Sequence, residues 1–476
     1  MTSALDIRRD VVSRRRTAAE VCAEALTRLD RISRLNACIT VSADRALARA
    51  RELDRRADLH SLPLAGVPIA VKDNICTQGL RTTAASRVLE QYAPPYDATV
   101  IERLEAAGAV VVAKTNCDEF AMGSSTEYSA FGPAKNPWDP SRIAGGSSGG
   151  SAIAVATRAV PLALGSETGG SVRQPAALCG TVGLKPTYGR VSRFGLLAFV
   201  SSLDQIGLFG TDVRDVASGL QVMAGADPRD ATAAATAVDD YAAACDRDIR
   251  GLRIGVPESL LEEGVETGVR AAFDDAIRTL RTAGAETIPI DLPHSRYATA
   301  TYAIVVMAEA SSNLSRYDGV RFGTRAAGHT VDEMYARTRA LFGREVKRRI
   351  MLGTYVLSAG YYDAYYRKAR QVQALIRKDF DDAFGHVDVV ATPTSPTIAF
   401  PLGERVETPV QMYLADIFTA SANLAGMPAM SVPCGFSEGM PVGLQLSAGP
   451  WCEATLFRAA AAFERLTPWS AKRPPD

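Results

Sequence analysis

The sequence lacks the features that define several large classes of proteins. No uninterrupted run of about 18 apolar residues occurs, and the longest candidate, 152–165, is interrupted by Arg158 and Pro161. The first residues, MTSALDIRRDVVSRRR, are charged and lack the apolar core of a secretory signal. Net charge is also absent, because 53 Lys and Arg residues balance 53 Asp and Glu residues. We therefore expect neither a membrane-spanning helix nor a global field that attracts polyanions.

Paired cysteines and frequent histidines are missing as well. The 8 cysteines are scattered with no CxxC pair, so neither a zinc site nor a disulfide framework is expected. We expect reduced thiols and a cytoplasmic protein. The 4 histidines lie in polar surroundings, which favours surface or loop positions over a role as catalytic base. Their positions are His60, His294, His329 and His386.

The pattern of apolar residues indicates an α/β protein. Hydrophobic residues make up 47% and charged residues 22% of the chain, which is ordinary globular composition and excludes wholesale disorder. Thr17 and Glu20 have the spacing of a capping box before a helix. The stretches 97–113 and 273–290 each predict a helix, a glycine stop and a buried strand rich in β-branched residues. Further strands are expected at 252–256 and 387–391.

A block rich in glycine and serine at 143–190 is the most informative part of the sequence. Such a block is typical of a flexible linker, but here it encloses apolar runs at 152–156 and 161–164 that are expected to be buried. Glycines in that context favour sharp bends or close approach of the backbone to a ligand. The block contains neither a P-loop, because Lys185 is followed by Pro186, nor a dinucleotide-binding GxGxxG motif.

Two catalytic arrangements fit this block. The G-x-S-x-G spacing from Gly145 to Gly149 around Ser147 matches a nucleophile elbow, which requires a histidine base. A lysine also serves as base in Ser–Lys arrangements. Lys72 ends an apolar, strand-like run, and burial there lowers the pKa of a lysine towards that of a useful base. Taken alone, a lysine in this position is more often a salt-bridged structural residue, and Lys72 gains its weight from combination with the serine block.

Three segments together resemble the amidase signature family. They are 70–74 (AVKDN), 145–151 (GGSSGGS) and 165–175 (GSETGGSVRQP). The resemblance implies that Ser171 is the nucleophile, that Ser147 bridges through a cis peptide bond, and that Lys72 is the terminal base. A hydroxyl both donates and accepts, so a bridging serine can pass a proton. The resemblance further implies an oxyanion hole formed by the N–H groups of Thr168, Gly169, Gly170 and Ser171.

Neighbouring positions receive structural interpretations. We expect Ser148 and Ser151 to make structural hydrogen bonds and Arg173 to brace the site without a chemical role. Two positions differ from the family pattern: Glu167 stands where Asp is common, and Leu208 stands where Pro is usual. Glu167 keeps the charge, whereas Leu208 is expected to alter a loop.

The resemblance also predicts the fold and the domain organisation. It implies an α/β amidase-signature fold in which helices cover both faces of a large mixed β-sheet. Length alone permits about three domains, but no low-complexity linker divides the chain. We therefore predict a single amidase domain over 1–476, with an N-terminal helical segment at about 1–60, a signature core at about 61–215 and a C-terminal α/β portion at about 216–476.

Further segments resemble the family of A subunits of glutamyl-tRNA(Gln) amidotransferases. They are 118–123, 190–195, 202–207, 309–319, 345–350 and 360–366. The resemblance implies a glutaminase that supplies ammonia to a B subunit, within a heterotrimer completed by a C subunit. No cofactor is expected in this chain, while ATP and Mg are expected at the B subunit, which also holds most of the mischarged tRNA. Glu-tRNA(Gln) and Asp-tRNA(Asn) both remain open as acceptors.

By the same resemblance, Tyr302, Arg349 and Asp416 hold L-glutamine. An Arg fork suits an α-carboxylate and an Asp suits an α-ammonium, whereas a neutral amide needs neither. Without the resemblance, a surface-paired Arg349 and a capping Asp416 explain these residues equally well. The rival hypotheses are a stand-alone amidase acting on small aliphatic or aryl amides, and an inactive scaffold, which would have no need for the serine–lysine set.

Two tyrosine pairs, 361/365 and 362/366, lie four residues apart beside several Lys and Arg residues. They fit a surface on which RNA bases stack. They also fit helix packing surrounded by solvated charges, which is the interpretation we favour from the sequence.

Overall fold

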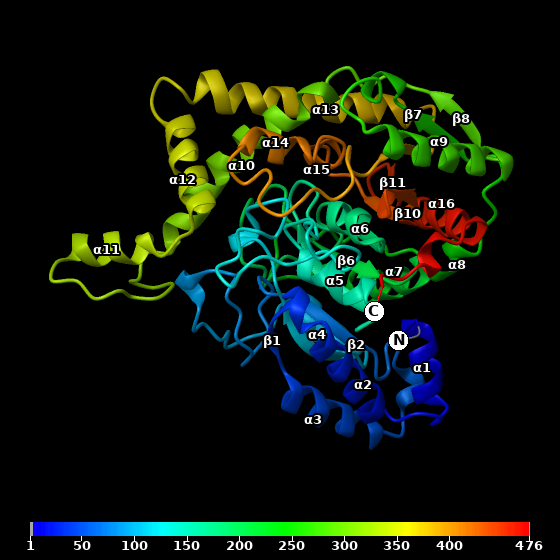
Figure 1. Ribbon diagram of the computed structural model, residues 1–476, viewed down its shortest axis with the longest axis horizontal. Coiled ribbons are helices and arrows are strands. Elements are labelled where there is room, and N and C mark those ends of the chain that lie inside the picture. Colours follow the sequence, from blue (N-terminus) through cyan, green and yellow to red (C-terminus); the bar gives the residue numbers. More distant parts are fainter. Residues whose placement is uncertain (1–2, 476) are drawn as a thin grey trace.

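A computed structural model describes residues 3–475 and contains a single mixed sheet of 11 strands (Figure 1). Its order is β1-β3-β2-β4-β6-β5-β10-β11-β9-β7-β8. The strands are β1 (Cys38–Val41), β2 (Pro68–Lys72), β3 (Val110–Thr115), β4 (Leu162–Glu167), β5 (Val182–Lys185), β6 (Gln205–Gly210), β7 (Arg253–Val256), β8 (Glu286–Pro289), β9 (Val389–Pro393), β10 (Ala429–Ser437) and β11 (Met440–Ala448).

Sixteen α-helices surround the sheet within the described residues. They are α1 (Ala4–Val12), α2 (Ala18–Arg31), α3 (Ala43–Asp54), α4 (Thr99–Ala106), α5 (Gly149–Ala156), α6 (Arg173–Cys179), α7 (Val213–Met223), α8 (Tyr241–Cys245), α9 (Thr267–Thr282), α10 (Ala298–Asn313), α11 (Val331–Ala340), α12 (Arg344–Leu357), α13 (Lys368–Ala383), α14 (Pro409–Leu414), α15 (Ala420–Leu424) and α16 (Glu453–Leu466). Among residues 3–475, no helix is long and apolar enough to cross a membrane.

The sheet combines two parallel groups with an antiparallel middle, and its edge strand β1 runs antiparallel to β3. Strand β2 runs parallel to β3 and β4, and β7 runs parallel to β8 and β9. Between them, β4, β6, β5, β10, β11 and β9 are joined by antiparallel pairing. The predicted large mixed sheet is therefore confirmed.

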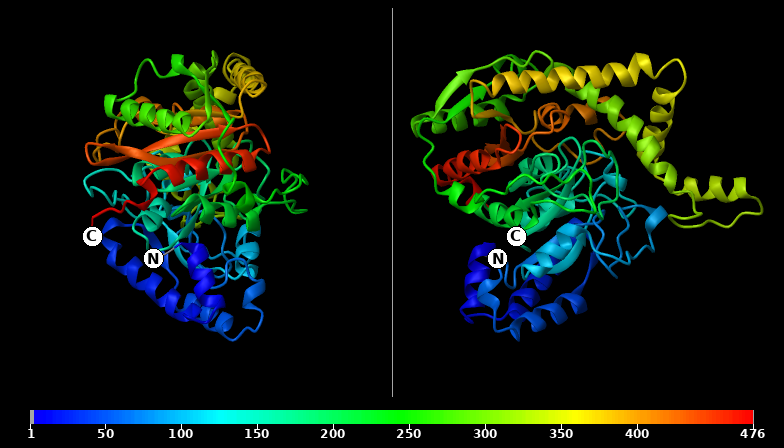
Figure 2. Two further views of the ribbon diagram at one scale, coloured as in Figure 1. Left: turned by 90° about the vertical axis from the view of Figure 1, so that its right-hand side faces the viewer. Right: turned by 180° about the vertical axis from the view of Figure 1, so that it is seen from behind.

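Helices pack on both faces of this sheet (Figures 1 and 2). In the register of β10 and β11, Gly435 pairs with Val442. Gly443 packs against Ala177 of α6, whereas Gly435 packs against Ala272 of α9. Because successive strand residues point to opposite faces, α6 and α9 cover opposite sides, as the resemblance implies.

Several local predictions from the sequence are confirmed. The Thr17 hydroxyl accepts the Glu20 N–H at 3.1 Å, and the Glu20 carboxylate accepts the Thr17 N–H at 2.8 Å, completing the capping box at α2. The stretch 97–113 forms α4 and leads into β3, with Gly108 at φ +95°. Strands β7 and β9 lie at the two further predicted positions.

Two local predictions from the sequence are wrong. The strand predicted near 287–290 forms as β8, but it is only partly buried because it is the last strand of the sheet. The N-terminal segment contains α1, α2 and α3 and, between the last two, the short strand β1, which pairs with β3. Leu208 does not alter a loop: it lies inside β6, paired with Leu164 and Leu184, and is buried.

Candidate active site

Lys72 and Ser147 lie in direct contact at the end of β2. The Lys72 ammonium donates to Ser147 Oγ at 2.7 Å, to Ser148 Oγ at 2.8 Å and to the Ser166 carbonyl at 3.2 Å. Lys72 is the last residue of a fully buried strand. Burial lowers the pKa of its side chain to about 8, against the opposing effect of nearby acidic groups. A lysine in this state is close to neutral at moderately alkaline pH and can accept a proton.

Ser147 follows a cis peptide bond between Gly146 and Ser147, as the resemblance implies. It stands shortly before α5, whose residues are all buried, so the apolar run at 152–156 is core and not linker. The Ser151 hydroxyl donates to the Leu164 carbonyl at 2.8 Å, the structural role expected for it. The Ser148 hydroxyl likewise makes the expected structural hydrogen bond, to the Ser166 carbonyl at 3.1 Å, and in addition it accepts from Lys72.

Ser171 lies next to this group, two residues before α6, and is 7% exposed. Its carbonyl accepts the Ser148 N–H at 3.2 Å. Among the described residues, the Ser171 hydroxyl itself has no hydrogen-bond partner. The structure thus brings Lys72 and Ser147 into hydrogen-bond contact and places Ser171 on the adjoining loop, where its hydroxyl is free to meet a substrate.

The loop 168–171 has the properties required for binding an oxyanion. Within residues 3–475, the N–H groups of Gly169, Gly170 and Ser171 donate to no acceptor. The loop is anchored by the Thr168 hydroxyl, which donates to Asp204 Oδ1 at 2.7 Å. Asp204 also accepts two backbone N–H groups of the 199–200 segment at 2.9 and 2.8 Å. Free N–H groups on an anchored loop can stabilise a developing negative charge.

Glycine is required twice on this loop because two side chains press against it. A Cβ added to Gly169 would lie 2.4 Å from Cζ of Tyr302, and one added to Gly170 would lie 2.8 Å from Oδ1 of Asp416. Two of the three residues predicted to hold glutamine therefore flank the loop that carries Ser171.

Asp416 is a buried carboxylate with one oxygen available. Its Oδ2 accepts the Ser124 hydroxyl at 2.5 Å, and its Oδ1 has no hydrogen-bond partner among the described residues. Burial raises the pKa of Asp416 to about 7, although the Ser124 hydrogen bond and the charge of Arg349 oppose the rise. Its side chain does not cap a helix, which removes the alternative interpretation from the sequence.

Arg349 is buried on α12 and not paired at the surface. Its Nε donates to Glu345 Oε1 at 2.8 Å, and the Tyr413 hydroxyl donates to the same oxygen at 2.9 Å. The guanidinium lies over the rings of Phe199 and Tyr413, at 5.6 and 5.3 Å. Among residues 3–475, its two terminal nitrogens have no acceptor, so they remain available for a carboxylate.

Arg173 braces the site, as expected from the sequence. It forms a fully buried ion pair with Glu167 and also bonds to Gln445, Thr419 and Asn423. Burial alone acts to raise the pKa of Glu167. The charge and hydrogen bonds of Arg173 nevertheless hold this pKa below its usual value. The longer Glu167 side chain is thus accommodated in a complete network.

The sequence interpretation missed four residues that support the site. Asp204 anchors the oxyanion loop, Glu345 and Tyr413 orient the guanidinium, and Ser124 holds the carboxylate. Short motifs at 118–123 and 202–207 marked this region, but only the folded chain shows which side chains meet.

None of the histidines approaches the site. His60, His329 and His386 are exposed. His294 lies 2.8 Å from the Asp379 carboxylate through its Nδ1. The expectation that the histidines are surface or loop residues is therefore confirmed, and the nucleophile elbow around Ser147 has no histidine base.

The described residues contain no group of three or more His, Cys, Asp and Glu side chains arranged to hold a metal ion. The candidate site consists instead of serine hydroxyls, one lysine, free backbone N–H groups and two separate charged side chains. The arrangement is suited to nucleophilic attack by a serine, proton transfer through hydroxyls to a lysine, and stabilisation of an oxyanion by backbone N–H groups.

Comparison with known proteins gives consistent results. The family model described as Amidase matches residues 20–457. The chain is 58% identical to the A subunit of the glutamyl-tRNA(Gln) amidotransferase of Chloroflexus aurantiacus, covering 96% of this chain and 95% of that one. It is 53% identical to the corresponding protein of Thermosynechococcus vestitus, covering 98% of each.

Solved structures extend the similarity to the fold. The crystal structure of the A subunit of the glutamyl-tRNA(Gln) amidotransferase of Thermotoga maritima is 43% identical, with a TM-score of 0.80 over 95% of this chain and 92% of that chain. The peptide amidase of Stenotrophomonas maltophilia is 31% identical, with a TM-score of 0.85 over 100% of this chain and 98% of that chain.

Proposed function

The chain belongs to the amidase family, and on that premise we propose that it is the glutamine-hydrolysing subunit of a tRNA-dependent amidotransferase. Its relatives at 53–58% identity are A subunits of glutamyl-tRNA(Gln) amidotransferases. The observation that carries the choice of substrate is the pair of buried, opposite charges beside the Ser171 loop. Arg349 offers two free nitrogens and Asp416 one free oxygen, which match the α-carboxylate and α-ammonium of a free amino acid.

In this proposal Ser171 attacks the side-chain amide of glutamine. Its proton passes through Ser147 towards Lys72, and the tetrahedral oxyanion is bound by the N–H groups of the 168–171 loop. Return of a proton to the leaving nitrogen releases ammonia and leaves a glutamyl ester on Ser171. Water then hydrolyses this ester by the same route in reverse, with the serine–lysine relay acting as base.

The proposed assembly places the remaining chemistry on partner chains. Ammonia passes to a B subunit, where ATP and Mg support amidation of the mischarged tRNA, and a C subunit completes the heterotrimer. The acceptor is Glu-tRNA(Gln), Asp-tRNA(Asn) or both. We place the complex in the cytoplasm, where aminoacyl-tRNAs are used, and assign no cofactor to this chain.

The test is ammonia release from L-glutamine by the chain co-purified with its partners, compared with Ser171→Ala and Lys72→Ala variants. We expect release that depends on both residues and rises with ATP and mischarged tRNA, while circular dichroism shows that both variants stay folded. Full turnover by Lys72→Ala contradicts the relay. Absence of release from glutamine, together with turnover of a small aliphatic or aryl amide, indicates a stand-alone amidase.

A further inference from the structure

One segment of the chain carries a large share of its positive charge. Residues 316–370 contain twelve Arg and Lys residues and five Asp and Glu residues, a formal charge of +7. Since the whole chain has zero net charge, the remaining residues carry −7. The zero net charge of the whole chain therefore includes a strongly basic segment. The absence of a global electrostatic field does not exclude a positive potential around residues 316–370.

This segment forms one edge of the molecule, which we call the basic edge (residues 316–370). It comprises α11, α12, a π-helical turn at Asp363–Arg367 and the first residues of α13. Figure 1 shows it as the yellow-green left side, with α11 projecting from the body, and Figure 2 shows the same projection from behind. Residues that belong to several helices thus share one rim of the structure.

Many cations of the basic edge are not neutralised within the chain. Among residues 3–475, six of them are exposed and form no ion pair with a carboxylate. These are Arg316, Arg321, Arg325, Lys347, Lys368 and Arg370. By contrast, Arg349 is buried in the candidate active site and is not part of this surface. Exposed, unpaired cations at this density favour a polyanionic partner.

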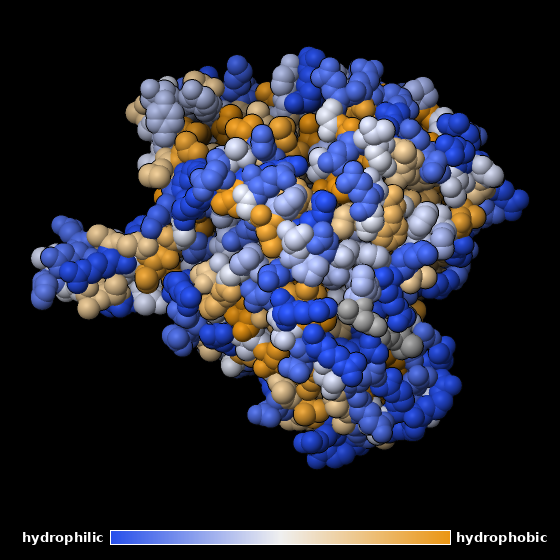
Figure 3. Space-filling view, viewed as in Figure 1, coloured by the Kyte–Doolittle hydropathy of each residue, from blue (hydrophilic) through white to orange (hydrophobic). Residues whose placement is uncertain are grey.

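Exposed aromatic rings are interleaved with these cations. Tyr355, Tyr361, Tyr362 and Tyr365 are 47, 40, 45 and 40% exposed. The rings of Tyr355 and Tyr361 lie 4.3 Å apart and are tilted by 38°. The interpretation favoured from the sequence is therefore only partly right. The rings of each pair do lie side by side, at 6.0 Å for Tyr361 and Tyr365 and 5.3 Å for Tyr362 and Tyr366, but all of these rings except that of Tyr366 remain open to solvent. The space-filling view shows this upper left corner as a mixed polar and apolar surface (Figure 3).

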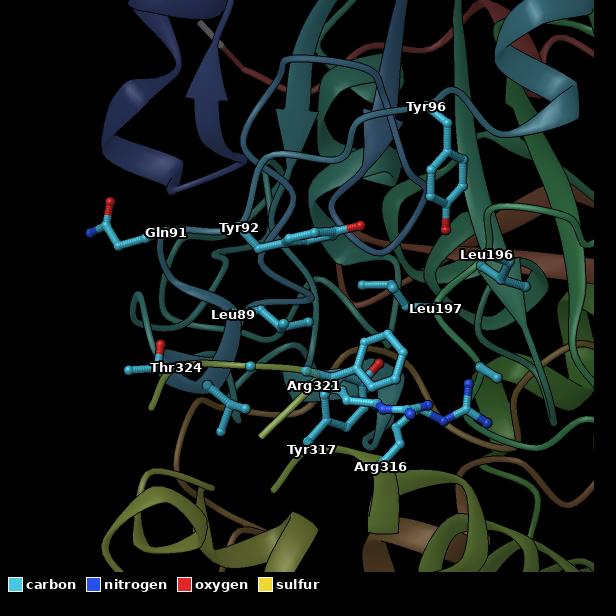
Figure 4. A pocket seen from close by; sticks show the side chains of 14 residues that line it. Leu89, Gln91, Tyr92, Tyr96, Leu196, Leu197, Arg316, Tyr317, Arg321 and Thr324 are labelled. Atoms are coloured by element: carbon cyan, nitrogen blue, oxygen red, sulfur yellow. The ribbon is translucent and has the colours of Figure 1, made fainter. Parts of the chain in front are cut away.

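A cavity at the base of the projection has the same combination of cationic and aromatic side chains. A cavity of about 410 Å³ lies there, lined by Arg316, Arg321, Tyr92 and Tyr96 among others. Figure 4 shows the two guanidinium groups extending to the same side of the cavity, with the tyrosine rings opposite. None of the predicted catalytic residues lines this cavity. Guanidinium groups opposite aromatic rings suit a phosphate joined to a flat base.

We propose that the basic edge binds RNA, with its cations contacting phosphates and its tyrosines stacking on unpaired bases. The proposal rests on the proposed function, which supplies a tRNA as the RNA. The alternative occupant is an acidic polypeptide, for which the exposed Met351 and Leu352 would be suited. The centres of protein interfaces are depleted of charge, however, whereas here each exposed tyrosine beyond residue 360 lies within seven residues of an unpaired cation.

The experiment measures binding of a fluorescein-labelled tRNA(Gln) transcript to the full-length chain by anisotropy, from 50 to 300 mM KCl. The charge variant is Arg321→Glu, Lys368→Glu, Arg370→Glu. Its matched control reverses three exposed arginines on α2 and α3 and in the turn after α3, namely Arg31→Glu, Arg51→Glu, Arg55→Glu. A second variant, Tyr362→Leu, Tyr365→Leu, keeps apolar bulk and removes the rings.

We expect the charge variant to lose at least tenfold in affinity and to lower the slope of log K against log salt by about two to three, since each phosphate contact contributes ~0.9. The tyrosine variant should lose about tenfold with an unchanged slope, and the control should keep wild-type affinity. Absence of tRNA binding by the wild-type chain at 50 mM KCl overturns the proposal. The proposal is also overturned if the charge variant binds tRNA as the wild type does but no longer co-purifies with a partner chain. That result would identify the basic edge as a protein interface.

Glutamine hydrolysis by the same preparations separates the two proposals. The charge and tyrosine variants leave the candidate active site intact and should hydrolyse glutamine at the wild-type rate. If hydrolysis is normal and tRNA binding is unaffected by the charge variant, the basic edge proposal alone fails. If the wild-type chain and its complex do not hydrolyse glutamine, the proposed function fails, and the binding data then concern an RNA-binding surface of unknown purpose.

Discussion

Lowering the pH from 8 to 6 should reduce the kcat/KM of glutamine hydrolysis by about two to three orders of magnitude. In the proposed mechanism two groups must lose a proton for activity: Lys72, with a pKa of about 8, and Asp416, with a pKa of about 7. A base with a pKa of about 8 is half neutral at pH 8 and about 1% neutral at pH 6, and a carboxyl with a pKa of about 7 falls from about 90% to about 10% ionised. The product of these fractions falls roughly 500-fold.

The value of kcat/KM falls at low pH because each of the two groups loses its function when it is protonated. A protonated Lys72 cannot accept the proton that leaves Ser171, and a protonated Asp416 cannot attract the α-ammonium of glutamine. Both losses act in the same direction, so the acid limb of log kcat/KM should approach a slope of two below about pH 7. Because kcat/KM reports the free enzyme, the ligand-free values are the appropriate ones.

The assay is ammonia release from L-glutamine at concentrations well below KM, in buffers of constant ionic strength between pH 5.5 and 9. In Asp416→Asn, which removes one of the two ionisations, the activity should be lower throughout and the acid limb should have a slope of one. A wild-type profile that is flat between pH 6 and 8 refutes the assignment of Lys72 as a base. An acid limb of unchanged slope in Asp416→Asn refutes the role given to that carboxylate.

Two further substitutions test residues that act through others. Asp204→Asn weakens the anchoring of Thr168. Because the proposed oxyanion loop stabilises the transition state, steady-state kinetics should show kcat lowered by ten- to a hundredfold with little change in KM. An equal rise in KM would contradict this role. Glu345→Gln loosens Arg349 and should raise KM for glutamine about tenfold while kcat changes little, which isothermal titration of a Ser171→Ala background can verify; unchanged affinity would remove Glu345 from substrate positioning.

Much of the fold follows from sequence patterns because those patterns are local. The capping box at Thr17, the glycine stop at Gly108 and the apolar run before Lys72 each depend on residues a few positions apart, and each forms as predicted. Position within the sheet is different. Strand β8 has a sequence suited to burial, yet it ends the sheet, because the number of strands beside it is decided by the whole topology and not by its own residues.

The residues of the candidate site likewise fall into two groups: those marked by a local motif and those brought together only by the folded chain. Ser147 and Ser171 lie within one glycine-rich block, and the resemblance of that block to the amidase signature selects them. Asp204, Glu345 and Ser124 escaped notice because their importance lies in contacts across 36, 4 and 292 positions, with Thr168, Arg349 and Asp416 respectively. A carboxylate four residues from an arginine on one helix looks like an ordinary surface pair, and only burial reveals its function.

The tyrosines at 361–366 show the limit of a local pattern. Their spacing of four residues is the spacing of helix neighbours, and the rings of each pair do lie side by side. Tyr361, Tyr362 and Tyr365 nevertheless stay exposed at the end of α12, whereas Tyr366 is half-buried. Periodicity states which side chains share a face, but it does not state whether another element covers that face.

The separation of the site residues along the chain has a consequence for synthesis on the ribosome. Ser171 emerges early, whereas Asp416 follows 245 residues later. Synthesis proceeds at roughly 5–20 residues per second. The nascent chain therefore carries Ser171 for roughly 12 to 50 seconds before Asp416 has been added. Arg349 also arrives late. An unfinished chain therefore lacks the residues proposed to hold glutamine, and we expect hydrolysis to begin only after the C-terminal part of the chain has been made.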